Sequence, residues 1–155
     1  MIDRSQSAES TDVLLIDPSP ETARLIRAGV ADRHPTTVFH TVADGADALD
    51  FLHRDGEYTD APRPALVVLR LELPEPGPDG LDVLEAIDRT PGLPSVPVVV
   101  TVASPTEEVI QEAYQRGANA VVPIPDEPDA LAETMDRVAR FWIATARLPN
   151  RDDRL

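Results

Sequence analysis

The sequence predicts an α/β domain in which a five-stranded parallel sheet is doubly wound, with helices on both faces. Five short apolar runs alternate along the chain with five segments of helical periodicity, a pattern typical of parallel sheets. The runs are almost continuously apolar, as strands buried on both faces are. A chain of 155 residues without cysteine can bury about two thirds of its unfolded surface without disulfides. We therefore expect one domain over residues 12–148, between flexible tails at 1–11 and 149–155.

The strand assignments rest on short apolar runs that end at proline, glycine or charged residues. Residues 12–17 hold a run that Pro18 and Pro20 end, and residues 36–42 are rich in β-branched and aromatic side chains, which favour strands. Three further strands are expected at 65–69, 96–102 and 118–122.

The helix assignments rest on apolar residues spaced three and four apart. Such spacing occurs at 21–32, 45–54 and 81–89. A fourth helix is expected to begin after Ser104, because Ser104 is a suitable N-cap and Pro105 suits the first helical position. The last helix, at about 127–146, is expected to pack against the core or its edge through one stripe: Leu131, Met135, Val138, Trp142 and Ala146.

The composition excludes several classes of protein. With 14 basic and 28 acidic residues the net charge is −14, which argues against sequence-independent nucleic-acid binding. No apolar run approaches the roughly 20 residues that span a bilayer, and the polar N-terminus is unlike a signal peptide. We expect a cytoplasmic protein without membrane contact. All basic residues are arginine, which together with the acidic excess favours a halophilic source. The alternative is a GC-rich genome.

In a parallel α/β sheet, the working site lies at the carboxyl ends of the strands. The side chains expected there include one acid and one cation at strand ends, Asp17 and Arg70. The sequence therefore predicts an ion pair between them; the alternative is that Arg70 extends to solvent. The remaining strand-end residues are Pro18, Glu72, Val102, Ala103, Ile124 and Pro125.

Six segments, taken in order, resemble the receiver domain of two-component response regulators. They are 13–20, 43–49, 65–74, 79–81, 96–100 and 117–120. In addition, residues 53–63 and the pair Phe141-Trp142 resemble stand-alone receivers of archaea. The resemblance covers about residues 12–148. It implies a chemotaxis-type, flavodoxin-like fold with strand order 2-1-3-4-5, and a role in phosphorelay signal transduction.

The resemblance also implies a definite chemistry. In receivers, two acids after the first strand hold Mg²⁺, an Asp ending the third strand accepts a phosphoryl group, and a hydroxyl and a Lys bind its oxygens. Of these groups, only the first acid is kept, as Asp17. The other matching positions are occupied by Pro18 (second acid), Arg70 (acceptor), Val102 (hydroxyl), Ile124 (Lys, before Pro125) and Val121 (the aromatic switch residue).

A shift of register does not recover the missing groups. Thr101 would point to the opposite face of its strand from Val102, and Ser104 is assigned to the helix cap. The lysine cannot be displaced, because the chain contains none.

The resemblance does imply a cis bond before Pro125. The three histidines lack metal-ligand spacing.

These departures predict a degenerate receiver that binds no metal or cofactor, catalyses no reaction and acts by protein contact. The resemblance implies a contact face that joins the fourth helix, fifth strand and last helix. The expected partners are a sensor kinase, a regulator domain or another receiver, including a homodimer through the last helix. One alternative is phosphoryl acceptance on a displaced acid, Glu72 or Asp17. Another is a small-molecule sensor at the strand ends, where Val102 and Ile124 replace polar groups.

Overall fold

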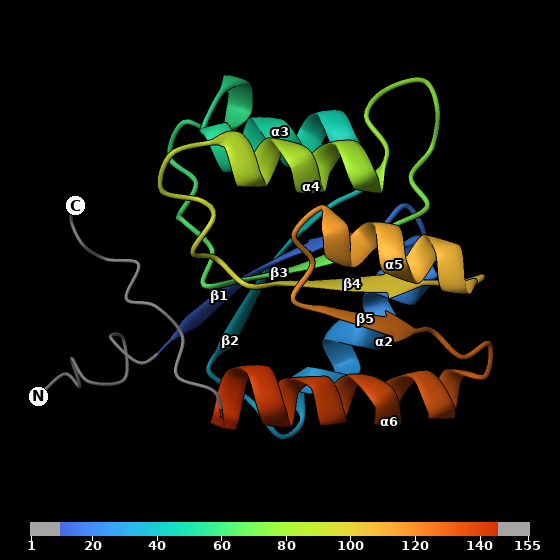
Figure 1. Cartoon of the computed structure of the whole chain (residues 1–155). Helices are drawn as coiled ribbons and strands as arrows, with labels where there is room; N and C mark the ends of the chain where they lie inside the picture. The colour runs from blue at the N-terminus through green and yellow to red at the C-terminus, as the bar shows by residue number, and fades with distance from the viewer. Residues whose placement is uncertain (1–9, 146–155) are drawn as a thin grey trace, which may run out of the picture.

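The structure is a computed structural model that describes residues 10–145 (Figure 1). The predicted five-stranded parallel sheet is confirmed, with order β2-β1-β3-β4-β5. The strands are β1 (Thr11–Ile16), β2 (Thr37–Val42), β3 (Leu66–Arg70), β4 (Val98–Val102) and β5 (Ala120–Pro123). The helices are α2 (Pro20–Ala31), α3 (Gly45–His53), α4 (Gly80–Arg89), α5 (Glu107–Gln115) and α6 (Pro128–Ala139).

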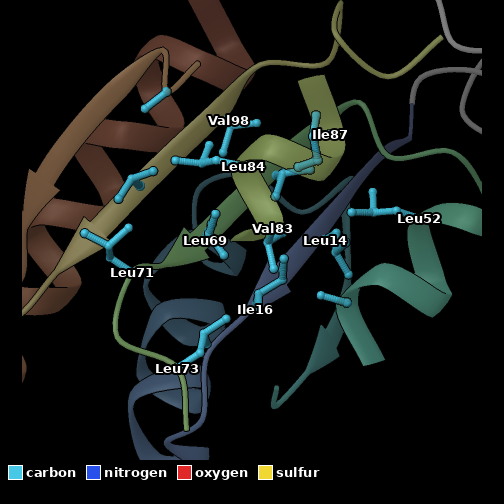
Figure 2. Packing of buried hydrophobic residues seen from close by; sticks show 14 of the residues in the cluster. Leu14, Ile16, Leu52, Leu69, Leu71, Leu73, Val83, Leu84, Ile87 and Val98 are labelled. Carbon is cyan, nitrogen blue, oxygen red and sulfur yellow. The ribbon is translucent and has the colours of Figure 1, made fainter. Parts of the chain in front are cut away.

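The sheet separates two hydrophobic cores. Alternate residues of the central strands point to opposite faces, so that Leu14 and Ile16 lie in one core whereas Val13 and Leu15 lie in the other. The first core is closed by α3, α4 and α5, and the second by α2 and α6 (Figure 1). Figure 2 shows the first core, where side chains of β1 and β3 meet those of α4. None of the helices within residues 10–145 is long and apolar enough to cross a membrane.

Strand register determines which residues meet at the carboxyl edge of the sheet. Ile16 of β1 pairs with Leu69 of β3, so the next residues along, Asp17 and Arg70, are neighbours. Arg70 in turn pairs with Thr101 of β4. The last residue of β3 therefore lies between the end of β1 and the end of β4.

The start of α5 differs from the sequence prediction. The N-cap is Thr106, whose hydroxyl accepts the N–H of Val109 at 3.1 Å, and not Ser104. Pro105 disfavours helical geometry at the residue before it, and the N–H of Ser104 points instead to the carboxylate of Glu72. The residues between β4 and α5 thus form a short loop rather than a first helical turn.

Four smaller expectations also need correction. Thr11, assigned to the tail, is the first residue of β1. Residues 55–64, between the expected helix at 45–54 and the expected strand at 65–69, contain a 3-10 turn at Gly56–Tyr58. The last helix changes to a π-helical segment at Arg140–Thr145, where the half-buried Trp142 packs against the α2–α6 core as predicted.

The bond before Pro125 is trans, the form that X–Pro bonds prefer by default. The cis bond among the described residues is Glu75–Pro76. Ala146 and residues 149–155 lie outside the described range.

The chain after β3 is held close to α4 by a glycine. A Cβ atom on Gly80 would lie 2.5 Å from the carbonyl oxygen of Leu71 and 2.6 Å from its Cα. Because both neighbours are backbone atoms, Gly80→Ala requires α4 or residues 71–73 to shift. We expect the variant to lose about 1–3 kcal/mol of unfolding free energy, measured by urea denaturation. An unchanged midpoint would show that this approach is not a constraint.

Candidate functional site

The carboxyl ends of β1 and β3 bring an acid and a cation into direct contact. Asp17 follows β1, and its side chain has no exposed surface. Nη1 of Arg70 lies 3.2 Å from Oδ2 and 3.4 Å from Oδ1 of Asp17. Oδ1 also accepts the N–H of Ser19 at 2.9 Å, which ties the carboxylate to the turn before α2. The guanidinium therefore turns inward, as the ion-pair prediction requires, and the Arg70 side chain is 17% exposed.

A second acid completes the group of charges. Nε of Arg70 donates to Oε1 of Glu72 at 2.9 Å. Across the gap to β4, the N–H of Ala103 donates to Oε2 at 3.0 Å and to Oε1 at 3.2 Å, and the N–H of Ser104 donates to Oε2 at 3.3 Å. Arg70 thus joins Asp17 to Glu72, and Glu72 joins β3 to the loop before α5.

From the sequence, Glu72 was predicted at this edge only as an alternative phosphoryl acceptor, and its hydrogen-bond partners were not assigned. The available signal was its position two residues after Arg70, which puts both side chains on the same side of an extended chain. The backbone donors of Ala103 and Ser104 carry no sequence signal of their own, because every residue except proline has an N–H.

The surroundings shift the pKa values of the two carboxyl groups, Asp17 and Glu72, in opposite directions. Burial raises the pKa of Asp17, and the N–H of Ser19 and the charge of Arg70 only partly oppose that effect. Burial also raises the pKa of Glu72, but hydrogen bonds from Arg70, Ala103 and Ser104 outweigh it, so that the net pKa is lowered. Ionised Glu72 is therefore stabilised by the fold, whereas ionised Asp17 depends on Arg70.

The other strand-end residues do not join this group. Val102 is fully buried in the core under α3, α4 and α5, whereas Ile124 packs against the opposite core with α2 and α6. Thr101 is buried and lies on the opposite face from Val102, as predicted. Val121 packs against the first core, and its N–H donates to the hydroxyl of Tyr114 at 3.2 Å.

A cavity of about 220 Å³ lies beside Asp17 on the side of β2. Its lining combines the turn after β1 with the end of β2: Asp17, Pro18, Pro20, Ala23, Arg27, Thr41, Val42 and Ala43. Val102 and Ile124 are absent from this lining, so the cavity is not the apolar strand-end pocket that the small-molecule alternative expected.

Each of the three histidines lies beside a polar side chain of another segment. Within residues 10–145, no three His, Asp or Glu side chains gather as metal ligands would. His40 bonds to Asp12 at 3.0 Å, His53 to the hydroxyl of Thr90 at 3.1 Å, and His34 lies 3.5 Å from Asp136. Each histidine thus has a structural partner of its own.

The lowered pKa of Glu72 predicts a pH-dependent contribution to stability. Its folded pKa lies below the usual 4.5, so the unfolded state takes up the proton first as the pH falls. The free-energy difference between the wild type and Glu72→Gln should be full above pH 4.5 and decline as the pH falls through the folded pKa. Because the side chain is 44% exposed, the difference should be modest. Urea denaturation across that range measures it, and a difference that grows toward acid would contradict it.

Comparison with known proteins agrees with this architecture. The family model "Response regulator receiver domain" matches residues 13–136. The chain is 31% identical to the response regulator Rcp1 of Synechocystis sp. over 140 residues, covering 88% of this chain and 92% of Rcp1. It is 30% identical to the probable methanogenesis regulatory protein FilR2 of Methanothrix harundinacea over 138 residues, covering 88% and 86%.

Solved structures give the same result. The Mn²⁺-bound form of Rcp1 superposes with a TM-score of 0.85 at 30% identity, covering 90% of this chain and 99% of that one. The phosphorylated cyanobacterial phytochrome response regulator RcpA superposes with a TM-score of 0.86 at 32% identity, covering 91% and 99%. With the matching sheet order, these findings show that the chain belongs to the response regulator receiver domain family of two-component signalling.

Proposed function

We propose that this receiver passes signals on by protein contact without accepting a phosphoryl group. The observation that carries the proposal is the pairing of Arg70 with both Asp17 and Glu72 at the end of β3. A guanidinium cannot form an acyl phosphate and stays protonated at physiological pH. In this position it is a permanent internal cation between two acids.

The lysine and hydroxyl side chains that bind the phosphoryl oxygens in receivers are also missing from their matching positions. The transferred group spreads negative charge over its oxygens, and catalysis depends on cations and hydrogen-bond donors placed around it. The chain contains no lysine, and the side chains of Val102 and Ile124 are apolar and packed into opposite cores. These features support a receiver that stays in one chemical state.

We propose further that the Mg²⁺ site of the family is lost in this chain. A divalent cation of this kind prefers oxygen ligands, usually one or two carboxylates with water and substrate oxygens. Asp17 supplies one carboxylate, but both its oxygens already face the guanidinium of Arg70 and one also accepts the N–H of Ser19. Pro18 adds no ligand atom from its side chain. The donor set therefore does not suit Mg²⁺ while Arg70 holds this position.

The proposed contact face consists of α5, β5 and α6, which lie together at the sheet edge that β5 forms (Figure 1). On α5, Tyr114 is 49% exposed, and after α6, Phe141 is 53% exposed. The proposed partners are a sensor kinase, a regulator domain or another receiver, including a second copy, in the cytoplasm. The relation to a phytochrome response regulator favours a sensor kinase. The net charge of −14 disfavours direct contact with nucleic acid.

A second candidate is phosphoryl acceptance on a displaced acid. The similarity to phosphorylated RcpA favours it, and Glu72 is the acid in question because it is partly exposed and contacts the loop after β4. Against it, the Glu72 oxygens already accept hydrogen bonds from Arg70, Ala103 and Ser104. Those bonds stabilise the carboxylate and lower its nucleophilicity.

A phosphoryl mimic separates the two candidates. Uniformly ¹⁵N-labelled protein is titrated with beryllofluoride in the presence of Mg²⁺, with RcpA as the positive control. We expect the amide signals of Asp17, Glu72 and Ala103 to stay unchanged, since no acid is available to hold the mimic. Saturable shifts at these amides would overturn the proposal and support a displaced acceptor.

A further inference from the structure

The loop between β4 and α5 is held by a carboxylate from another strand. Ala103 and Ser104 follow β4 directly, and their N–H groups both point at Oε2 of Glu72, at 3.0 and 3.3 Å. Consecutive backbone N–H groups that converge in this way form a concave site for an anion. Here the anion belongs to the chain itself.

The same carboxylate is also held from the side of β3. Nε of Arg70 donates to Oε1 at 2.9 Å, so that Glu72 has one cationic donor and two backbone donors. Charge-assisted hydrogen bonds of this kind are stronger than neutral ones. Arg70 is in turn fixed by the buried carboxylate of Asp17, which leaves the Glu72 side chain little freedom to turn away.

The loop that Glu72 holds determines where α5 begins. Pro105 follows Ser104 and leads into Thr106, the N-cap of α5. Residues Ala103 to Pro105 are exposed. On α5, Ala113 near the far end is buried, whereas Val109 near the start is only partly buried against the same core. The N-terminal end of α5 therefore depends on this loop as well as on Val109 for its position.

We infer that Glu72 is an internal anionic ligand that positions the β4–α5 loop and, through it, the N-terminal end of α5. The inference rests on the proposed function, because α5 belongs to the proposed contact face. It assigns Glu72 a positioning role: the acid fixes the shape of that face in the absence of any added group. Arg70 bonds both to Glu72 and to the buried Asp17. The contacts of Asp17, Arg70 and Glu72 therefore join the end of β1, the end of β3 and the loop before α5.

Amide hydrogen exchange tests the inference residue by residue. In Glu72→Ala, exchange at Ala103 and Ser104 should accelerate by about tenfold or more, because their acceptor is gone. The matched control, Glu75→Ala, removes an exposed acid from the same loop after β3 and should leave both rates unchanged. Acetate should slow the exchange again in Glu72→Ala in a saturable way, whereas chloride at equal ionic strength should not.

A second variant distinguishes the loss of the carboxylate from a general loss of structure. Glu72→Gln keeps an oxygen acceptor but no charge, and we expect rates between those of the wild type and Glu72→Ala. Unchanged exchange at Ala103 and Ser104 in both variants would overturn the inference, as would equal acceleration at all amides of β4 and α5 without an effect of acetate. The result does not depend on whether an acid can hold a phosphoryl group, which the beryllofluoride titration tests separately. Either proposal can therefore fail while the other stands.

Discussion

Arg70→Met is expected to lower the free energy of unfolding by about 3–5 kcal/mol, the usual cost of removing one partner from a buried ion pair. Asp17 has no exposed side-chain surface, and without Arg70 its remaining hydrogen bond comes from the N–H of Ser19. Burial already raises the pKa of Asp17, so its charged form disfavours folding unless it is compensated. Urea denaturation at neutral pH measures the loss.

Three comparisons make that prediction specific. Arg24→Met removes an arginine that is 63% exposed and lies 3.9 Å from its acid, and should change stability by less than about 0.5 kcal/mol. The double variant Asp17→Asn with Arg70→Met should recover much of the loss, because no buried charge remains. The loss should also shrink toward acidic pH, as Asp17 takes up a proton. A loss no larger than that of Arg24→Met would show that the pair is not a buried charge contact.

The second prediction concerns reconstruction of the missing chemistry. Four substitutions, Pro18→Asp, Arg70→Asp, Val102→Thr and Ile124→Lys, return the receiver groups to their matching positions. We expect this variant to gain one phosphoryl group per chain when incubated with acetyl phosphate and Mg²⁺, where the wild type gains none. The reason is that transfer needs an acceptor carboxylate, a metal site and donors for the developing charge together. Intact mass spectrometry measures the gain.

The matched control keeps arginine at position 70 and carries the other three substitutions. Because it has the restored metal acid, hydroxyl and lysine but no acceptor, it should gain no phosphoryl group. Circular dichroism shows whether each variant is folded. Phosphorylation of the control would place the acceptor at another acid and contradict the role given to Arg70.

The fold was largely predictable because each strand is a short apolar run and each helix has a clear apolar face. The contact between Asp17 and Arg70 followed from the strand order that the receiver resemblance implied, because Asp17 follows β1 and Arg70 ends the neighbouring β3. The partners of Glu72 were not predictable, because they depend on the path of the backbone at Ala103 and Ser104. For the same reason Ser104 was wrongly assigned as a helix cap.

Other differences have equally local causes. The trans bond before Pro125 shows that a family feature cannot be carried over without the residues around it. The change from α6 to a π-helical segment at Arg140 has no clear signal in the apolar stripe, which continues through Trp142. The apolar side chains at Val102 and Ile124 were evident from the sequence. That Val102 is buried in one core and Ile124 packs against the opposite one required the structure.

The most direct test of the central claim is the intact mass of the wild-type protein after incubation with acetyl phosphate and Mg²⁺, and separately with a sensor kinase and ATP. RcpA, treated in parallel, confirms that the reagents are active. Because Arg70 stands at the end of β3 and is paired with Asp17 and Glu72, we predict no change in mass. A gain of one phosphoryl group, located on Asp17 or Glu72 by fragmentation, would contradict the account.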